Sequence, residues 1–192
     1  ALYGKGVVFQ ELGRPEEALE IFSELLSFYP GFEKAWYRRG IILFSHEYYA
    51  EALESFEQAI LEDQTEIPEE IDELGLDEIQ GEKQTESPGL NEKFRLEDKL
   101  NDTETEDAWT KMGLSQIKLG DYEAALDIFE KILEVKPDAA DLWYVAGLAL
   151  RGLDQDGQAV EAFEKAVEID PTLEAAWEQL GLSLLRLNMY EE

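Results

Sequence analysis

The stretch AWTKMG, Ala108 to Gly113, places a glycine four residues after a tryptophan in the middle of the chain. Three close versions of the same phrase occur elsewhere: AWYRRG at residues 35–40, LWYVAG at residues 142–147 and AWEQLG at residues 176–181. A phrase that returns in this way indicates an internal repeat, so its spacing is the first property to measure.

The repeat has a period of 34 residues, which separates Trp109 from Trp143 and Trp143 from Trp177. The same interval separates other pairs of like residues: Phe129 and Phe163, Ala125 and Ala159, Pro137 and Pro171, Phe22 and Phe56, Ala18 and Ala52, and Gly6 and Gly40. A shared period at several unrelated positions predicts an architecture of stacked structural units.

Residues 106–139 predict a pair of helices. In the first helix, Trp109, Met112, Gly113 and Gln116 recur at the spacing of one helix face. We interpret this face as the one turned toward the second helix of the pair, with residues of the other face left for neighbours or partners.

The two helices of this pair have clear boundaries in the sequence. The first ends around Leu119-Gly120-Asp121, where glycine favours the conformation that closes a helix. The second is predicted from about Tyr122 to Val135 and is ended by Pro137. The next helix is expected to begin near Asp138 or Asp141, since acidic side chains favour a helix N-terminus.

The recurring glycine is interpreted as a packing device. Gly113 lacks a Cβ atom, so two helices can approach closely there. Trp109 is expected to fill the wider gap one turn earlier, and Ala125 to serve as the small residue on the facing helix.

These residues resemble the tetratricopeptide repeat family, whose signature contains Trp, Leu-Gly, Tyr, Ala, Phe, Ala and Pro at fixed spacing. Residues 138–173 match it at Trp143, Gly147, Ala159, Phe163, Ala166 and Pro171. Residues 33–64 match it at Trp36, Gly40, Leu43, Ala52, Phe56 and Ala59, with Gln64 in place of the proline. The resemblance implies an all-α, right-handed superhelical solenoid of antiparallel helix-turn-helix repeats, interrupted by an acidic insertion.

The period divides the chain into five repeats and one insertion. We expect repeats at residues 1–32, 33–64, 106–139, 140–173 and 174–192, with the insertion at residues 65–105. The first repeat lacks its opening residues and the last contains its first helix without the second, so we expect a fragment of a longer protein, or ends that pair with another copy.

The insertion follows from the spacing of two tryptophans, because Trp36 and Trp109 are 73 residues apart, which exceeds one period by 39. Residues 64–105 contain 14 acidic and four basic residues. The segment is interpreted as a solvated loop at a repeat junction, or as an acidic element that folds back on the array or docks a basic partner. A calcium site is a further alternative, although the Asp-x-Asp-x-Asp-Gly pattern of a calcium loop is absent.

The composition limits the classes of partner. The chain has 192 residues and a formal net charge of -29, so most of its surface repels nucleic acid and anionic lipid. The sequence contains neither an apolar run of membrane-spanning length nor a signal peptide pattern. It also lacks cysteine, which suits a reducing cytoplasmic location and excludes thiolate metal sites.

In the resembled family, the outward side of each first helix lines a concave groove that takes extended peptides or helices. Carried over to this chain, the resemblance implies a partly apolar, locally basic groove on an acidic body. Its residues are Lys34, Tyr37, Arg38, Ile41, Phe44, Thr110, Leu114, Lys118, Tyr144, Leu148, Arg151, Leu182 and Arg186. The alternative is that the apolar members of this set pack between neighbouring repeats.

Some members of the family clamp the C-terminal carboxylate of a partner with basic and asparagine side chains. Lys34 and Arg38 match the last basic pair of that pattern, but Tyr3 and Val7 stand where its asparagines belong. The sequence therefore departs from the carboxylate clamp.

No catalytic arrangement competes with the binding interpretation. His46 is the single histidine and lies near a helix end, and no phosphate loop or metal-ligand spacing is present. We therefore predict a non-catalytic protein-protein interaction scaffold without cofactor or metal, whose partner is a protein or peptide of unknown identity. The alternative is a non-catalytic regulatory or substrate-recruiting region of a larger enzyme or assembly. Neither nucleic acid nor membrane is an expected partner, and exposed repeat ends are expected to promote self-association.

Overall fold

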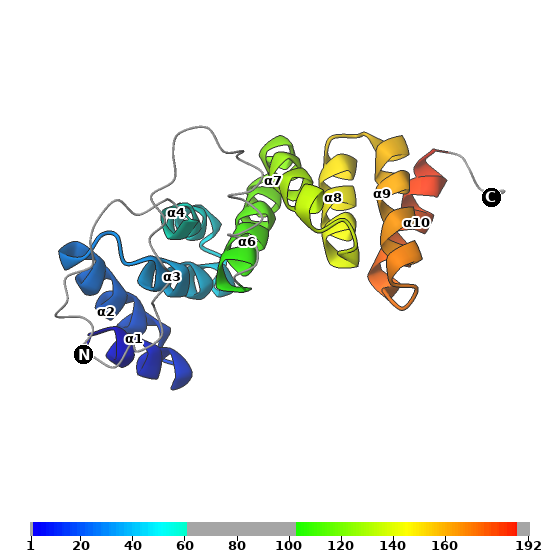
Figure 1. Ribbon diagram of the computed structural model, residues 1–192. Helices are drawn as coiled ribbons and strands as arrows, with labels where there is room; N and C mark the ends of the chain where they lie inside the picture. The colour runs from blue at the N-terminus through cyan, green and yellow to red at the C-terminus, as the bar shows by residue number, and fades with distance from the viewer. Residues whose placement is uncertain (1, 61–102, 188–192) are drawn as a thin grey trace. The chain divides into compact units, whose positions relative to one another are not determined.

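The computed structural model describes residues 2–60 and 103–187, and every regular element in these two ranges is an α-helix (Figure 1). The helices are α1 (Leu2–Glu11), α2 (Pro15–Phe28), α3 (Glu33–Ser45), α4 (Tyr49–Ile60), α6 (Thr103–Leu119), α7 (Tyr122–Val135), α8 (Ala140–Gly152), α9 (Asp156–Ile169) and α10 (Glu174–Arg186). We call α1, α3, α6, α8 and α10 the first helices, and α2, α4, α7 and α9 the second helices.

The chain divides into two compact units, residues 1–108 and residues 109–192, with the boundary inside α6. In the first unit α1 packs on α2, α2 on α3 and α3 on α4. In the second, α7 packs on α8, α8 on α9 and α9 on α10. Each unit is thus a stack of helix pairs in chain order, which confirms the predicted all-α repeat architecture.

The helix boundaries agree closely with the sequence pattern in the second unit. Helix α7 covers Tyr122–Val135 as predicted, and its N-cap Asp121 accepts a hydrogen bond from the Ala124 amide. Helix α8 differs in its cap, because Ala139 occupies the N-cap without a side-chain hydrogen bond. The helix begins at Ala140, between Asp138 and Asp141 as the sequence predicts, and Asp141 lies in its first turn.

The recurring glycine contacts a phenylalanine of the paired second helix. A Cβ atom added at Gly147 would lie 2.5 Å from the Phe163 ring, and the pairs Gly6 and Phe22, Gly40 and Phe56, and Gly113 and Phe129 show the same approach. All four phenylalanines have 0% exposure. The close approach assigned to the glycine is confirmed, but the ring of Phe129, rather than the side chain of Ala125, occupies the space opposite Gly113.

Three of the tryptophans form hydrogen bonds between successive repeats. The indole N–H groups of Trp36, Trp143 and Trp177 donate hydrogen bonds to the carbonyls of Pro30, Pro137 and Pro171, at 2.6, 2.8 and 3.0 Å. Each proline lies six residues before its tryptophan and ends the preceding repeat. The Trp109 indole nitrogen is buried without a partner among the described residues, and no proline stands six residues before it.

One turn position has a left-handed backbone in four of the repeats. Gly13 and Gly120 have φ of 67° and 84°, and the equivalent residues Glu47 and Asp154 have φ of 66° and 57°. Each residue lies seven positions after the packed glycine, in the turn that joins a first helix to its second helix. Glutamate at this position carries a steric cost that glycine avoids.

Replacing Glu47 by glycine is expected to raise the free energy of unfolding by about 0.5–1 kcal/mol, because relief of the positive φ outweighs the added freedom of the unfolded chain. Thermal unfolding followed by circular dichroism measures the change. The matched control is Glu54→Gly at an exposed position inside α4, where glycine is expected to cost about 1 kcal/mol. Equal losses in both variants would contradict the role assigned to the turn.

The predicted acidic insertion falls largely on residues 61–102, which lie outside the described residues. Its last residues, 103–105, form the first turn of α6. Across the described ranges, no helix combines the length and apolar character needed to cross a membrane.

Candidate functional site

The predicted groove residues lie on four first helices, α3, α6, α8 and α10. None of the thirteen is fully buried: Lys118, Leu182 and Arg186 are exposed, and the other ten are half-buried. Other faces of the same helices are fully packed, as the buried Ala108, Met112 and Gly113 of α6 demonstrate. The outward face of each first helix therefore retains accessible surface.

In the first unit, the aromatic residues of α3 in the predicted groove pack against a buried phenylalanine. The rings of Tyr37 and Phe44 both have centroids 6.5 Å from that of the buried Phe56. Phe44 also makes an edge contact with Tyr49 at 5.6 Å. Each of these rings therefore packs partly against the second helix of its own repeat and stays partly accessible.

The Tyr37 hydroxyl is fixed by a carboxylate. It donates a 2.8 Å hydrogen bond to Asp107, and both residues belong to the first unit. Burial and this hydrogen bond raise the pKa of Tyr37 well above its ordinary value, because both disfavour the phenolate. Tyr37 therefore stays a neutral hydrogen-bond donor at physiological pH.

The two neighbouring arginines of α3 have different surroundings. Arg39 donates a 2.5 Å hydrogen bond to Ser55 of α4 and lies over the Trp36 ring. Arg39 therefore serves the packing between α3 and α4. Arg38 is half-buried, and its Nε is buried without a hydrogen-bond partner among the described residues.

In the second unit, Tyr144 repeats the arrangement of Tyr37, since its ring centroid lies 6.1 Å from that of the buried Phe163. Tyr144 and Leu148 pack against the core that α9 and α10 share. The Arg151 guanidinium donates a hydrogen bond to Gln179 of α10. This bond joins neighbouring first helices directly, so α8 and α10 present adjacent strips of one face.

Arg186 at the end of α10 is paired within the chain. Its guanidinium lies 2.8 Å from Asp154, in the turn between α8 and α9, and 3.2 Å from Asp156, the first residue of α9. The sequence analysis placed Arg186 among the residues of the groove. In the structure its guanidinium forms ion pairs with these two carboxylates, while 46% of its side chain stays exposed.

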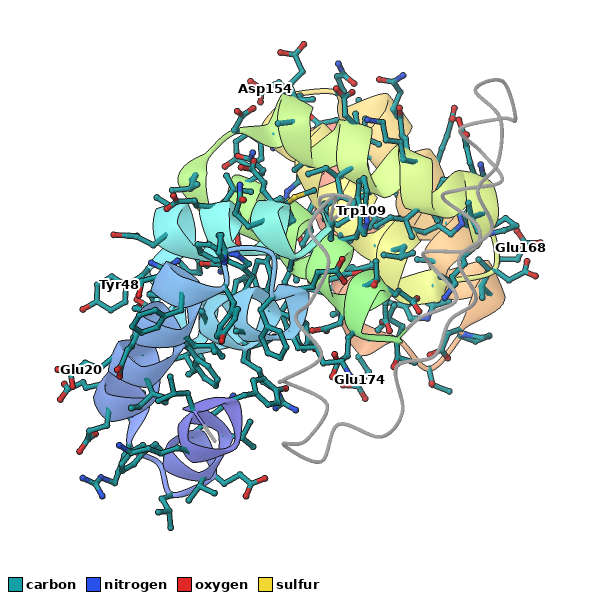
Figure 2. All side chains as sticks on the ribbon, turned by 60° about the vertical axis from the view of Figure 1, so that its left-hand side comes forward. Glu20, Tyr48, Trp109, Asp154, Glu168 and Glu174 are labelled. Atoms are coloured by element: carbon teal, nitrogen blue, oxygen red, sulfur yellow. The ribbon has the colours of Figure 1, made fainter. Side chains whose placement is uncertain are left out.

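The second helices carry exposed acidic side chains. Glu20 of α2 and Glu168 of α9 are exposed and project outward, as does Tyr48 before α4 (Figure 2). The pKa of Glu17 is lowered by its hydrogen bond to Arg14, and that of Asp170 by its bonds to Thr172. Both contacts are local features of helix and turn starts, so neither marks a tuned acid-base group.

The described residues give no support for a metal site. Residues 2–60 and 103–187 contain no group of three or more His, Asp or Glu side chains placed to hold a metal ion. His46 is the C-cap of α3, with Nδ1 2.8 Å from the Ile42 carbonyl oxygen. Within each unit, the first helices offer accessible aromatic, aliphatic and basic side chains.

Tyr3 of α1 stands at the equivalent position of the first repeat, and the predicted groove did not include it. Its ring packs 6.0 Å from Phe22 and 5.3 Å from Phe32. The signal was available, because Tyr3, Tyr37 and Tyr144 each stand three residues before the packed glycine of their repeat. Aligning the repeats on that glycine would have identified all three as one series.

Comparison with protein families identifies one kind of repeat along most of the chain. Three family models, each described as tetratricopeptide repeat, match residues 1–31, 33–65 and 110–174. A search of curated proteins found no match to the chain.

Solved structures share the fold. A crystal structure of MamA matches with a TM-score of 0.71 at 17% identity, covering 97% of this chain and 86% of that one. MamA from Desulfovibrio magneticus RS-1, residues 41 to the end, matches with a TM-score of 0.71 at 21% identity, covering 99% and 85%. YrrB, described as a TPR protein with an unusual peptide-binding site, matches with a TM-score of 0.67 at 16% identity, covering 100% and 78%.

Proposed function

The chain belongs to the tetratricopeptide repeat family, and on that premise we propose that it is a protein-interaction scaffold that binds a peptide or helix of a partner protein. Repeat stacks of this kind present extended surfaces suited to such partners. The proposed contact surface in the second unit, which we call the groove face, is formed by α6, α8 and α10. Its residues are Thr110, Leu114, Lys118, Tyr144, Leu148, Arg151, Leu182 and Arg186.

One observation carries this proposal: the groove face keeps apolar side chains accessible where neighbouring positions on the same helices are buried. Leu182 is 43% exposed, whereas Ala176 and Leu180 of the same helix are 0% and 8% exposed. Leu114 and Leu148, at the equivalent position of their repeats, are half-buried. A row of partly exposed leucines beside basic groups suits an apolar peptide that carries acidic residues.

The match to YrrB supports the class of partner. That protein is described as having a peptide-binding site, and it shares this fold at 16% identity. At such identity the likeness extends to the fold alone, so the peptide partner of this chain rests on its own groove face. The repeat fold is typical of non-catalytic scaffolds, and we propose that this chain is one.

The test is a pull-down from an extract of the source cell, read by mass spectrometry. The groove variant combines Lys118→Glu with Leu182→Glu, both exposed positions of the groove face. The variant keeps Tyr144, because its ring contacts the buried Phe163 and its loss would disturb the core. The control combines Lys131→Glu with Gln158→Glu, exposed positions of α7 and α9, and makes the same change in charge.

We expect a protein that the parent and the control retain equally and that the groove variant loses. Binding should fall at least about tenfold, since a charge then faces an apolar partner surface at one position and repels acidic groups at the other. Equal retention by all three baits would move the binding site away from the groove face. Loss from both variants would attribute retention to overall charge.

A second candidate is a regulatory or substrate-recruiting region of a larger enzyme or assembly. The acidic second helices give the chain a surface separate from the groove face on which other parts could dock. If the protein retained in the pull-down is an enzyme whose turnover changes only when the parent chain is added, this candidate replaces the simple scaffold.

A further inference from the structure

Arg186 forms ion pairs with two carboxylates that differ in exposure. Its Nη2 atom lies 2.8 Å from a carboxylate oxygen of Asp154, whose side chain is 85% exposed. Its Nε atom lies 3.2 Å from a carboxylate oxygen of Asp156, whose side chain is 14% exposed. One cation is therefore held between an accessible carboxylate in the turn and a largely covered carboxylate at the start of α9.

Asp156 occupies a position where the other repeats carry no charge. Aligning the repeats on the recurring glycine places Pro15, Tyr49 and Tyr122 at this position. A Cβ atom added at Gly152 would lie 2.5 Å from the Tyr122 ring, so there too the position faces the end of the next first helix. The Oδ1 atom of Asp156 is buried without a hydrogen-bond partner among the described residues. Packing alone does not account for such a carboxylate, because burying an unsatisfied polar group costs free energy.

The two ion pairs differ in how readily another anion can replace the carboxylate. An exposed ion pair stabilises a protein little, because water competes for both groups, so a second anion can replace Asp154 at little cost. The pair with Asp156 is harder to break, because loss of the cation would leave a largely covered carboxylate unpaired. Asp156 thus fixes the direction of the guanidinium, and Asp154 occupies its exchangeable side.

An accessible leucine lies next to this ion-pair site. Leu182 stands four residues before Arg186 on α10, so the two side chains are neighbours on one side of the helix. Leu182 is 43% exposed and belongs to the groove face. A partner segment that covers Leu182 with an apolar side chain can therefore bring an adjacent acidic side chain to Arg186.

We infer that Arg186 is the anion-binding residue of the groove face, and that a carboxylate of the partner peptide displaces Asp154 from it while Asp156 holds the guanidinium in place. The preferred partner segment then carries Asp or Glu beside an apolar residue. This inference rests on the proposed function, because it names the chemistry that the groove face recognises.

Selection from a library of random peptides displayed on phage provides the probe. Each peptide is joined to the coat protein through its C-terminus, so every carboxylate it offers belongs to an Asp or Glu side chain. We expect peptides selected on the parent chain to be enriched in Asp or Glu beside an apolar residue, and this enrichment to disappear on Arg186→Gln. The control Lys131→Gln loses the same charge at an exposed position of α7 and should select acidic peptides as the parent does.

The exchange itself is measured by fluorescence anisotropy with one selected peptide, labelled and amidated at its C-terminus. Asp154→Asn should bind this peptide about two- to fivefold more tightly, because the competing carboxylate is gone. Asparagine suits the left-handed backbone of this residue, where φ is 57°, so the turn is kept. Asp156→Asn should bind it at least about threefold more weakly, because the guanidinium is no longer held. The control Asp127→Asn removes the same charge at an exposed position of α7 and should bind like the parent.

Two outcomes would overturn the inference and leave the proposed function standing. One is selection of the same peptides by the parent and by Arg186→Gln. The other is equally tighter binding by Asp154→Asn and Asp127→Asn, which would attribute the change to overall charge. Selection of no peptide on the parent chain would count against the inference and the proposed function together.

Discussion

Replacing Phe163 by alanine is expected to lower the free energy of unfolding by about 3–5 kcal/mol. The ring has 0% exposure, lies against Gly147 and is flanked by Tyr144 at 6.1 Å. Its removal leaves a cavity between α8 and α9 that neither rigid helix can close. Because stability in a stack of repeats is nearly a sum over repeats and their interfaces, the loss should be concentrated in the second unit.

Urea unfolding followed by circular dichroism measures this loss. Phe28→Ala is the matched control, since Phe28 is 65% exposed and should change the free energy of unfolding by no more than about 0.5 kcal/mol. Similar losses in the two variants would show that burial against the glycine does not stabilise the repeat.

Replacing Gly147 by leucine is the second large effect, an expected net loss of about 2–3 kcal/mol. The first atom of the new side chain would lie 2.5 Å from the Phe163 ring, and further atoms of the same ring lie at 2.8 and 2.9 Å. A better helix former at this position would gain about 1 kcal/mol, but overpacking of a fully buried ring outweighs this gain.

The same substitution at Gly181 should have the opposite sign. A Cβ atom added at Gly181 would meet nothing within 4 Å, so the gain in helix propensity of up to about 1 kcal/mol is expected to remain. The two melting curves, compared with that of the parent, check the contrast. Destabilisation of similar size at both glycines would mean that the conformation of glycine, and not the space beside it, determines its role.

The repeat architecture was predictable because its signal is redundant. A period of 34 residues is carried by tryptophan, glycine, alanine and phenylalanine at once, and glycine or proline marks the helix ends. Helix α7 matches its predicted bounds for this reason. The Gly147 and Phe163 contact follows the same logic, because both partners repeat with the period.

The direction of single polar side chains was less predictable. Arg38 and Arg39 are adjacent in sequence, yet Arg39 bonds to Ser55 of α4 and Arg38 does not share that partner. Arg186 pairs with Asp154, 32 residues away, because the turn between α8 and α9 comes close to the end of α10. Such partners depend on tertiary packing, which residue spacing within one helix does not encode. The left-handed backbone at Glu47 was not predicted, because a glutamate gives no sign of the conformation that glycine indicates at Gly13 and Gly120 in the equivalent turns.

The thirteen predicted groove residues were inferred from the position of each residue within its repeat. The structure adds that these residues retain accessible surface and that Tyr37 and Tyr144 lean on core phenylalanines. The identity of the partner depends on a second molecule, whose sequence this chain does not contain.

The most direct measurement is photo-crosslinking from two exposed positions of the second unit, Leu182 on the groove face and Gln158 on α9. Each is replaced in turn by a photoreactive phenylalanine, and the chain is irradiated in an extract of the source cell. The account predicts that position 182 captures a partner protein through one peptide segment and that position 158 does not. Capture of the same segment from position 158 alone would contradict binding in the groove.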